Sequence, residues 1–287
     1  MLRIALFCLL ALPAAAQEAP PFAAFDLASE AVLNDPHDLA FGPDGRLYVA
    51  DKFASRVAVF DPETLELVEV LGEGAFPGIH DIAFGPDGRV AIAVTGTSVV
   101  AVFDDVTGLN GPPDALYPAP RTEGAAIHPD GRILAMAGGV GALAAFAAGE
   151  EPSVAQGGHF GAHDVAVDLN GDIWVADNAA RRLVRYSPTL ERLQDLDAAK
   201  YGFVGPRYLD VTDFGYLVVA DQDAHRVLLI DPAGPEGGTL LGVIGDGSPG
   251  IGANKFDDPE GVVVRGSRFW ISDSDNNRIV RYSVVIN

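Results

Sequence analysis

The sequence has a single cysteine and few basic residues. The first limits how the fold can be stabilised, and the second limits which partners it can bind. With Cys8 as its only cysteine, the chain cannot form an internal disulfide, so its stability must come from burial of a core. It has 19 Lys and Arg against 40 Asp and Glu, a formal net charge of −21. That excess of acid repels phosphate backbones and anionic lipids, so we expect no nucleic-acid partner and no membrane insertion. It is compatible with a metal ion or a cationic ligand.

Long hydrophobic runs are also missing beyond the first sixteen residues. The stretch "MLRIALFCLLALPAAA" has one basic residue, Arg3, then an apolar run from Ile4 to Leu12, and small residues up to Ala16. This order is typical of a secretory signal peptide, and the run is too short to span a bilayer. We therefore expect residues 1–16 to be cleaved and the mature chain, 17–287, to be exported to the periplasm or the extracellular space.

No segment keeps a helical apolar period over a dozen residues, but one phrase recurs along the chain. Residues 36–51 read "PHDLAFGPDGRLYVAD" and residues 79–94 read "IHDIAFGPDGRVAIAV". Asp or Asn followed by Gly is the chemistry of a tight turn between antiparallel strands. A sixth copy with a degenerate turn is "EGVVVRGSRFWISD" at 260–273. The turn glycine of the first five copies is Gly45, Gly88, Gly131, Gly171 and Gly215.

These repeats predict an all-β chain that forms a six-bladed β-propeller. Each unit has about 40–45 residues and joins three short apolar runs, and its second run is apolar almost throughout, as expected for a strand covered on both faces. A ring of such sheets leaves no apolar face exposed, whereas an open stack would leave two. The segment "FAAFDLAS" (22–29) precedes the first unit, and we expect it to close the ring as the outer strand of blade six. Residues 17–287 would then be a single domain.

The third runs carry a family resemblance. The stretches "VADKFASRVAVFD", "VADNAARRLVRYS", "VADQDAHRVLLID" and "ISDSDNNRIVRYS" are similar to NHL repeats, over essentially the whole mature chain. The resemblance implies an NHL-type propeller but does not imply one function, because propellers host unrelated chemistries. Within these stretches an Asp is followed five residues later by an Arg, and we expect these pairs to pin the neighbouring hairpins.

Aligning the six units on their turns places one polar residue of each unit at the start of its innermost strand. Because innermost strands line the central channel, these six residues should surround one mouth of it. Three of the chain's six histidines occupy this single position. The six ring residues are His37, His80, Glu123, His163, Arg207 and Glu260.

Imidazole and carboxylate together suit a divalent metal such as zinc, iron, copper or manganese. A metal with three protein ligands and one water could act in catalysis, because it lowers the pKa of that water or polarises a substrate oxygen. Arg207 could hold a carboxylate or a developing oxyanion, and Tyr208 is a weaker candidate for acid–base work. The alternative is a solvated channel mouth, in which polar residues bond to one another and Arg207 pairs with Glu260.

The phrases "PHDLAF", "IHDIAF" and "AHDVAV" also resemble the strand starts of peptidyl-hydroxyglycine α-amidating lyase, a six-bladed zinc enzyme. This resemblance implies that His37, His80 and His163 are metal ligands, with zinc as the expected metal. The pattern departs from the lyase, whose histidines come from alternating blades, whereas these come from blades one, two and four. A metal held by His37, His80 and Glu123 is the alternative. Gluconolactonase-like propellers, which bind calcium through oxygen ligands, are a poorer match.

Two functions follow from this reading. The first is a metal-dependent lyase or hydrolase of a small or peptide-like substrate. Glu123 would be the fourth ligand or the base, Arg207 would hold an anion, and Tyr208 would be the weaker candidate for acid–base work. The second is a scaffold that binds a ligand or a protein partner at the mouth without breaking a bond. The sequence contains no nucleophile motif that would decide between them.

Overall fold

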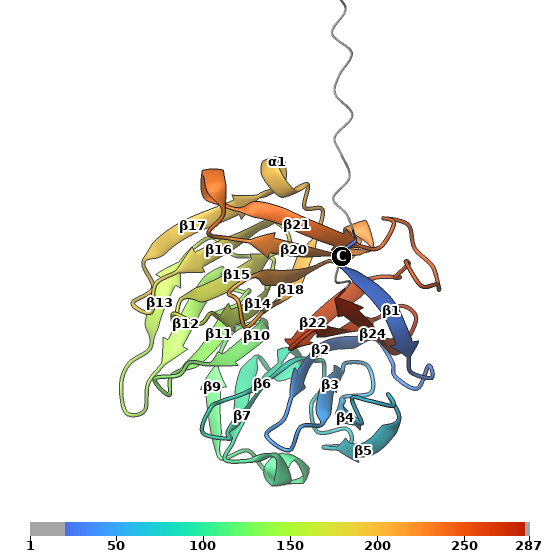
Figure 1. Cartoon of the computed structure of the whole chain (residues 1–287). Coiled ribbons are helices and arrows are strands. Elements are labelled where there is room, and N and C mark those ends of the chain that lie inside the picture. Colours follow the sequence, from blue (N-terminus) through green and yellow to red (C-terminus); the bar gives the residue numbers. More distant parts are fainter. Residues whose placement is uncertain (1–20, 285–287) are drawn as a thin grey trace, which may run out of the picture.

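The computed structural model describes residues 21–284 and confirms the predicted fold, an all-β six-bladed propeller. Six four-stranded antiparallel sheets stand around a central axis as a ring (Figure 1). The predicted signal peptide at 1–16, and the predicted domain ends at 17 and 287, lie outside the described residues. No helix within residues 21–284 is long and apolar enough to cross a membrane.

The blades follow the chain in order, each running from its inner to its outer strand. Blade one is β2 (Pro36–Phe41), β3 (Leu47–Asp51), β4 (Arg56–Phe60) and β5 (Leu67–Leu71). Blade two is β6 (Ile79–Phe84), β7 (Val90–Val94), β8 (Val99–Phe103) and β9 (Ala115–Pro118). Blade three is β10 (Thr122–Ile127), β11 (Ile133–Ala137), β12 (Ala142–Phe146) and β13 (Ser153–Gln156).

Blades four to six continue this order. Blade four is β14 (Ala162–Val167), β15 (Ile173–Asp177), β16 (Arg182–Tyr186) and β17 (Arg192–Asp197). Blade five is β18 (Pro206–Val211), β19 (Leu217–Asp221), β20 (Arg226–Asp231) and β21 (Thr239–Ile244). Blade six is β22 (Pro259–Arg265), β23 (Arg268–Asp273), β24 (Arg278–Val284) and β1 (Ala23–Ala28). The short helices are α1 (Ala198–Tyr201) and the 3₁₀ turns Thr95–Thr97, Val106–Asn110, Gln222–Ala224 and Pro235–Gly237.

The first strand of the fold closes the ring, as predicted from its sequence. β1 runs antiparallel to β24 and places Ala23 opposite Val284 and Ala28 opposite Val280 (Figure 1). Phe22, just before β1, is buried with its ring centroid 5.1 Å from that of Phe269. Blade six is therefore built from both ends of the described chain.

Apolar packing between neighbouring blades holds the ring together. The second strand of blades one to five is buried along its length, and in blade six only Arg268 of β23 is partly exposed. Each hydrophobic cluster joins side chains from adjacent blades. The hairpin glycines have the predicted turn conformation, with φ of 83° at Gly45 and 89° at Gly88. The predicted Asp–Arg pairs also form, with Nε of Arg56 2.7 Å from Asp51 and Nε of Arg278 2.7 Å from Asp273.

Candidate functional site

The six ring residues occupy one structural position, which is the second residue of each innermost strand. In every blade the pairing register between the first and second strands shifts at this residue. Such a β-bulge releases one residue from the ladder and re-aims its side chain. The repeated bulge therefore turns six polar side chains into one channel mouth.

Contacts run around much of this ring. His37 lies between Glu260 of blade six, at 2.6 Å from Nδ1 to Oε2, and His80 of blade two, with ring centroids 4.5 Å apart. Arg207 approaches Glu260, with Nη2 3.4 Å from Oε1, which is the ion pair that the sequence offered as an alternative. On the other side of the mouth Nε2 of His163 contacts Oε2 of Glu123.

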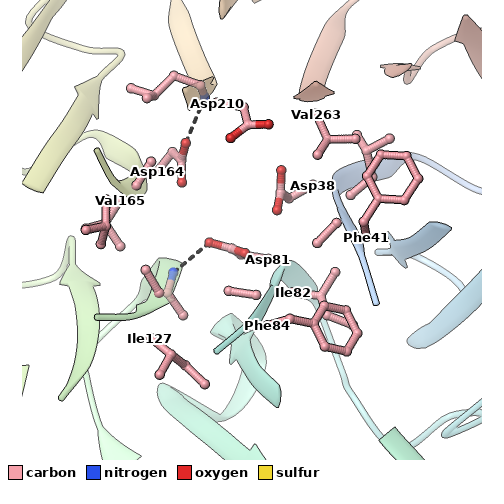
Figure 2. Close-up of a pocket in the computed structure, with 18 of the residues that line it drawn as sticks. Asp38, Phe41, Asp81, Ile82, Phe84, Ile127, Asp164, Val165, Asp210 and Val263 are labelled. Carbon is pink, nitrogen blue, oxygen red and sulfur yellow. Dashed lines mark hydrogen bonds between the residues drawn. The ribbon is translucent and has the colours of Figure 1, made fainter. Parts of the chain in front are cut away.

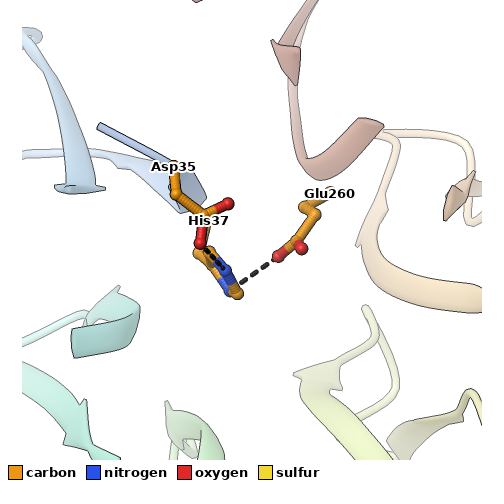
Figure 3. A group of neighbouring side chains, drawn as sticks. All are labelled: Asp35, His37 and Glu260. Carbon is orange, nitrogen blue, oxygen red and sulfur yellow. Dashed lines mark ion pairs between the residues drawn. The ribbon is translucent and has the colours of Figure 1, made fainter. Parts of the chain in front are cut away.

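The group best arranged for a metal ion is Asp35, His37 and Glu260 (Figure 3). One ligand atom from each lies within 4.8 Å of the others. His37 is fully buried, and its two ring nitrogens and Oε2 of Glu260 make no hydrogen bond of normal geometry with the described residues. Nδ1 of His37 faces Glu260, and Nε2 lies 3.4 Å from Oδ2 of Asp35, so the two carboxylates flank the imidazole and can pair with its charged form. A divalent metal could take the place of that proton, because an imidazole must be neutral to bind a metal.

Of the four expected ligands, only His37 belongs to this group, so the ligand set His37, His80, His163 and Glu123 remains a prediction. Aligning the six repeats of the chain did not identify Asp35, because only the ring position of each repeat was compared. A signal was present, since an Asp–Pro pair precedes the ring residue in both "DPH" and "DPE". Asp35 and Asp258 both have left-handed backbone conformation, with φ of 59° and 57°.

The charges around His37 favour a positive charge at this position. Burial alone would lower the pKa of His37, but Glu260 and Asp35 together raise it above its usual value. In turn, the pKa of Glu260 is lowered, because His37 and Arg207 outweigh its burial. Lys52 completes the group, with Nζ 2.9 Å from Oδ2 of Asp35.

His80 is a neutral imidazole of defined tautomer. Its Nδ1 lies 2.7 Å from the carbonyl of Gly78 and 2.9 Å from the hydroxyl of Thr95. That hydroxyl donates to the carbonyl of Thr122, so it can only accept from Nδ1–H. Burial and the charge of His37 lower the pKa of His80 to about 3. Nε2 therefore carries the lone pair, ready for a metal or a proton.

Glu123 and His163 form a separate pair across the mouth. Burial would raise the pKa of Glu123, but His163, His80 and Arg207 lower it to about 2. Burial lowers the pKa of His163, and its Nδ1 lies 3.2 Å from the carbonyl of Gly161. At neutral pH this pair is a carboxylate beside a neutral imidazole, which is an arrangement for holding a proton or a cation.

Arg207 and Tyr208 lie differently, although they are adjacent in sequence. Nη1 of Arg207 donates to Oε1 of Gln222 at 2.9 Å, and the guanidinium borders the mouth. Tyr208 is fully buried, and its hydroxyl donates to the carbonyl of His80 at 3.0 Å. Burial raises the pKa of Tyr208 well above its usual value. A hydroxyl so placed joins blade five to blade two rather than facing the mouth.

A cavity of about 420 Å³, the mouth pocket, opens beside the metal group over blades one, five and six. Its lining includes Asp35 and Glu260 from that group, together with Lys52, Phe53 and Arg207. A ligand in this pocket would contact Glu260 and Arg207 of the ring, together with Asp35 and Lys52.

A second cavity, the channel cavity, was not anticipated from the sequence. Its volume is about 320 Å³, and it is lined by apolar side chains and five aspartates. Four of these carboxylates converge in Figure 2, and the fifth belongs to Asp168. Asp38, Asp81 and Asp164 each follow a ring histidine, so the repeated "HD" was the signal, and Asp210 is the fourth. Burial raises the pKa of Asp81 to about 7 and that of Asp210 to about 6.

Comparison with known proteins supports the fold. The NHL repeat family model matches residues 33–60. No curated protein matches the sequence significantly. A catalytically inactive virginiamycin B lyase from Staphylococcus aureus, solved with quinupristin, is similar in structure, with 11% identity, a TM-score of 0.64, and coverage of 92% of this chain and 100% of that chain.

Binding proteins and other enzymes share the architecture. An auxiliary nutrient binding protein from Bacteroides thetaiotaomicron has 15% identity and a TM-score of 0.67, covering 88% of this chain and 69% of that one. Hydrazine synthase from Kuenenia stuttgartiensis has 15% identity and a TM-score of 0.63, covering 88% and 78%. At these identities the likeness is one of fold alone. The chain is thus a six-bladed β-propeller that carries an NHL repeat at residues 33–60.

Proposed function

We propose that this protein is an exported, metal-dependent lyase or hydrolase whose site is the ring mouth, and that Asp35, His37 and Glu260 hold a divalent metal there. The observation that carries the proposal is the convergence of a buried imidazole and two carboxylates, whose ligand atoms lie within 4.8 Å of one another, while the ring nitrogens of His37 and Oε2 of Glu260 make no hydrogen bond of normal geometry with the described residues. One imidazole and two carboxylates suit zinc, manganese or iron, and zinc is the metal we expect.

A metal at this position would supply a Lewis acid that polarises a substrate oxygen. The chain's own residues would do the rest of the work. Arg207, at the border of the mouth pocket, would stabilise negative charge that develops on the substrate during the reaction. His80 presents a neutral Nε2 that can complete the metal site or accept a proton. Glu123 keeps His163 oriented on the opposite side.

Two further observations support an enzyme. The virginiamycin B lyase of similar fold is described as catalytically inactive when one histidine is replaced by alanine, so propellers of this shape can use histidine-dependent chemistry. The sequence resemblance to the amidating lyase points to the same reaction class. The signal-like stretch at residues 1–16 supports export.

The alternative is a ligand-binding scaffold, and the nutrient-binding neighbours favour it. In that case the pocket would hold its ligand unchanged. Arg207 and Glu260 already bind each other and Gln222, which is the saturation expected of a static binding surface.

Metal binding tests the proposal first. Elemental analysis of protein purified without chelator, followed by calorimetric titration of Zn²⁺ into the stripped protein, should show one ion per chain. Glu260→Gln should weaken binding by more than about 100-fold, because changes to outer-shell partners alone cost about 10- to 100-fold. Glu69→Gln is the matched control, since Glu69 lies on β5, the outer strand of blade one, and pairs there with Arg46 of the β2–β3 turn.

Catalysis is tested separately. The metal-loaded protein is incubated with a mixture of small metabolites and short peptides, and the mixture is followed by mass spectrometry. Consumption of a component by the wild type but not by Glu260→Gln supports the enzyme. A protein that binds the metal and retains a component unchanged is the scaffold instead.

A further inference from the structure

The mouth pocket is polar on nearly every side. Of the side chains that line it, Phe53 is the only one that is neither polar nor charged. Pockets for hydrophobic ligands are lined mainly by apolar side chains, because an apolar ligand would strip water from polar groups without replacing its hydrogen bonds. The ligand of this pocket must therefore form hydrogen bonds over most of its surface.

The lining of the pocket also has more hydrogen-bond acceptors than free hydrogen-bond donors. Four carboxylates line it, those of Asp35, Asp258, Glu260 and Asp275, against two cationic side chains. Both cations are already engaged, Lys52 with Asp35 at 2.9 Å and Arg207 with Gln222 at 2.9 Å. A matching ligand must supply the donors. Hydroxyl groups do so, and each can also accept from the amides of the lining.

The net charge of the lining further limits the class of ligand that the pocket can bind. With four carboxylates and two cations the lining carries a negative excess, and a bound divalent metal would only neutralise it. An anionic ligand would therefore meet no surplus positive charge. A peptide backbone brings one carbonyl acceptor for each N–H donor, which does not match a lining rich in acceptors. A neutral ligand rich in hydroxyls matches it better.

Phe53 supplies the one apolar surface at the rim. Its side chain is 65% exposed, and the ring centroid lies 4.7 Å from Nζ of Lys52. Its backbone N–H donates to the carbonyl of Asn34, which ties this loop to the strand start of blade one. An exposed, well-anchored aromatic ring beside clustered carboxylates and amides can stack on the C–H face of a sugar while they bind its hydroxyls.

We propose that the mouth pocket recognises a neutral polyhydroxylated ligand, a monosaccharide or the terminal sugar of an oligosaccharide, with Phe53 as its stacking platform. This inference deepens the proposed function, because Asp35 and Glu260 form part of the same pocket. The sugar would be the substrate of the enzyme, with its hydroxyls directed toward the carboxylates and its ring lying against Phe53.

Phe160 provides a matched control. It is also 65% exposed, and it lies on the loop before β14 of blade four, but it is not among the residues that line the mouth pocket. Phe53→Ala and Phe160→Ala remove the same side chain from equally exposed positions, so a general effect of losing a surface phenylalanine would appear in both.

The experiment is isothermal calorimetry of the zinc-loaded protein with glucose, galactose, mannose, xylose, N-acetylglucosamine, maltose and cellobiose, with an N-acetylated dipeptide amide and betaine as comparisons. We expect at least one saccharide to bind, Phe53→Ala to weaken it by about tenfold, which corresponds to about 1.4 kcal/mol, and Phe160→Ala to leave it unchanged. The inference is overturned if none of the saccharides binds, if Phe53→Ala binds as the wild type does, or if only the dipeptide amide or betaine binds.

Repeating the titration on chelator-treated protein separates this inference from the proposed function. Saccharide binding by a protein that takes up no metal would overturn the metal-dependent enzyme and leave the sugar pocket standing. A protein that binds metal but no saccharide would give the opposite result.

Discussion

Single buried carboxylates hold separate segments of this propeller together, and Asp221 is an example. It is fully buried, its Oδ1 accepts from the backbone N–H groups of Val204 and Gly205, and its Oδ2 binds Arg226. One side chain thus joins the loop before its own blade to the next hairpin. The recurring Asp–Arg pair predicted this role, but the backbone partners could not be foreseen because they depend on how the loops fold back.

We predict that Asp221→Ala lowers the free energy of unfolding by about 3 kcal/mol, because it leaves the backbone N–H groups of Val204 and Gly205 and Nε of Arg226 without this acceptor. Arg226→Ala should cost about 1 kcal/mol, since that side chain is partly exposed. Urea denaturation of both variants measures the difference. Equal losses would mean that the ion pair, and not the backbone contacts, provides the stability.

At the level of strands, repetition made the fold predictable. The Asp-Gly and Asn-Gly turns, the buried second strands and the closing role of residues 22–29 all follow from local chemistry repeated along the chain. The site was only partly predictable. Alignment identified His37 and Glu260 as ring residues, but Asp35 reaches them through a left-handed backbone turn that no periodicity indicates. The acidic channel cavity depends on where six bulged strands converge, which is a property of the closed ring.

Closure by β1 leads to a prediction at this level. A chain that begins at residue 30 would lose the strand paired with β24 and would uncover the side chains of Phe269 and Tyr282, against which Phe22 and Phe25 pack. We expect it to melt at least several degrees below a chain that begins at residue 21, and to self-associate through the unpaired edge of β24. Calorimetry and sedimentation of the two chains provide the measurement. Equal melting and a monomeric shorter chain would contradict the closing role of β1.

At the scale of the whole molecule, the two ends of the central channel carry chemically different sites, the ring mouth and the channel cavity. The mouth gathers histidines, carboxylates and Arg207, whereas no Lys, Arg or His lines the channel cavity, among the residues that the structure describes. Burial and the neighbouring carboxylates raise the pKa of Asp38 and of Asp164 well above their usual values, beside Asp81. The channel carboxylates therefore favour a protonated state when the ring is folded.

The sign of the resulting pH effect follows from linkage. The folded protein binds protons on Asp81 up to about pH 7, whereas the unfolded chain releases them near pH 4. Ionising Asp81 therefore destabilises the fold as the pH rises from about 4 through 7. His80 acts in the opposite direction, because its pKa is lowered to about 3, so a variant is needed to isolate the effect of Asp81.

We predict that Asp81→Asn raises the free energy of unfolding at pH 8 by on the order of 2 kcal/mol and that the gain shrinks toward pH 5. The amide can still accept from the N–H of Ala125 and can donate to Asp38, with which Asp81 shares a side-chain hydrogen bond. Thermal melts of the wild type, Asp81→Asn and the exposed control Glu151→Gln across this range give the comparison. A gain for Asp81→Asn that does not vary with pH would contradict the assignment.

The central claim, that the ring mouth is built around a metal ion, is tested most directly by crystal diffraction. Crystals of the protein grown with Zn²⁺ are measured on both sides of the zinc absorption edge. The account predicts a strong anomalous peak about 2 Å from a ring nitrogen of His37 and from carboxylate oxygens of Asp35 and Glu260. A mouth without a peak, with or without one among the carboxylates of the channel cavity, would contradict it.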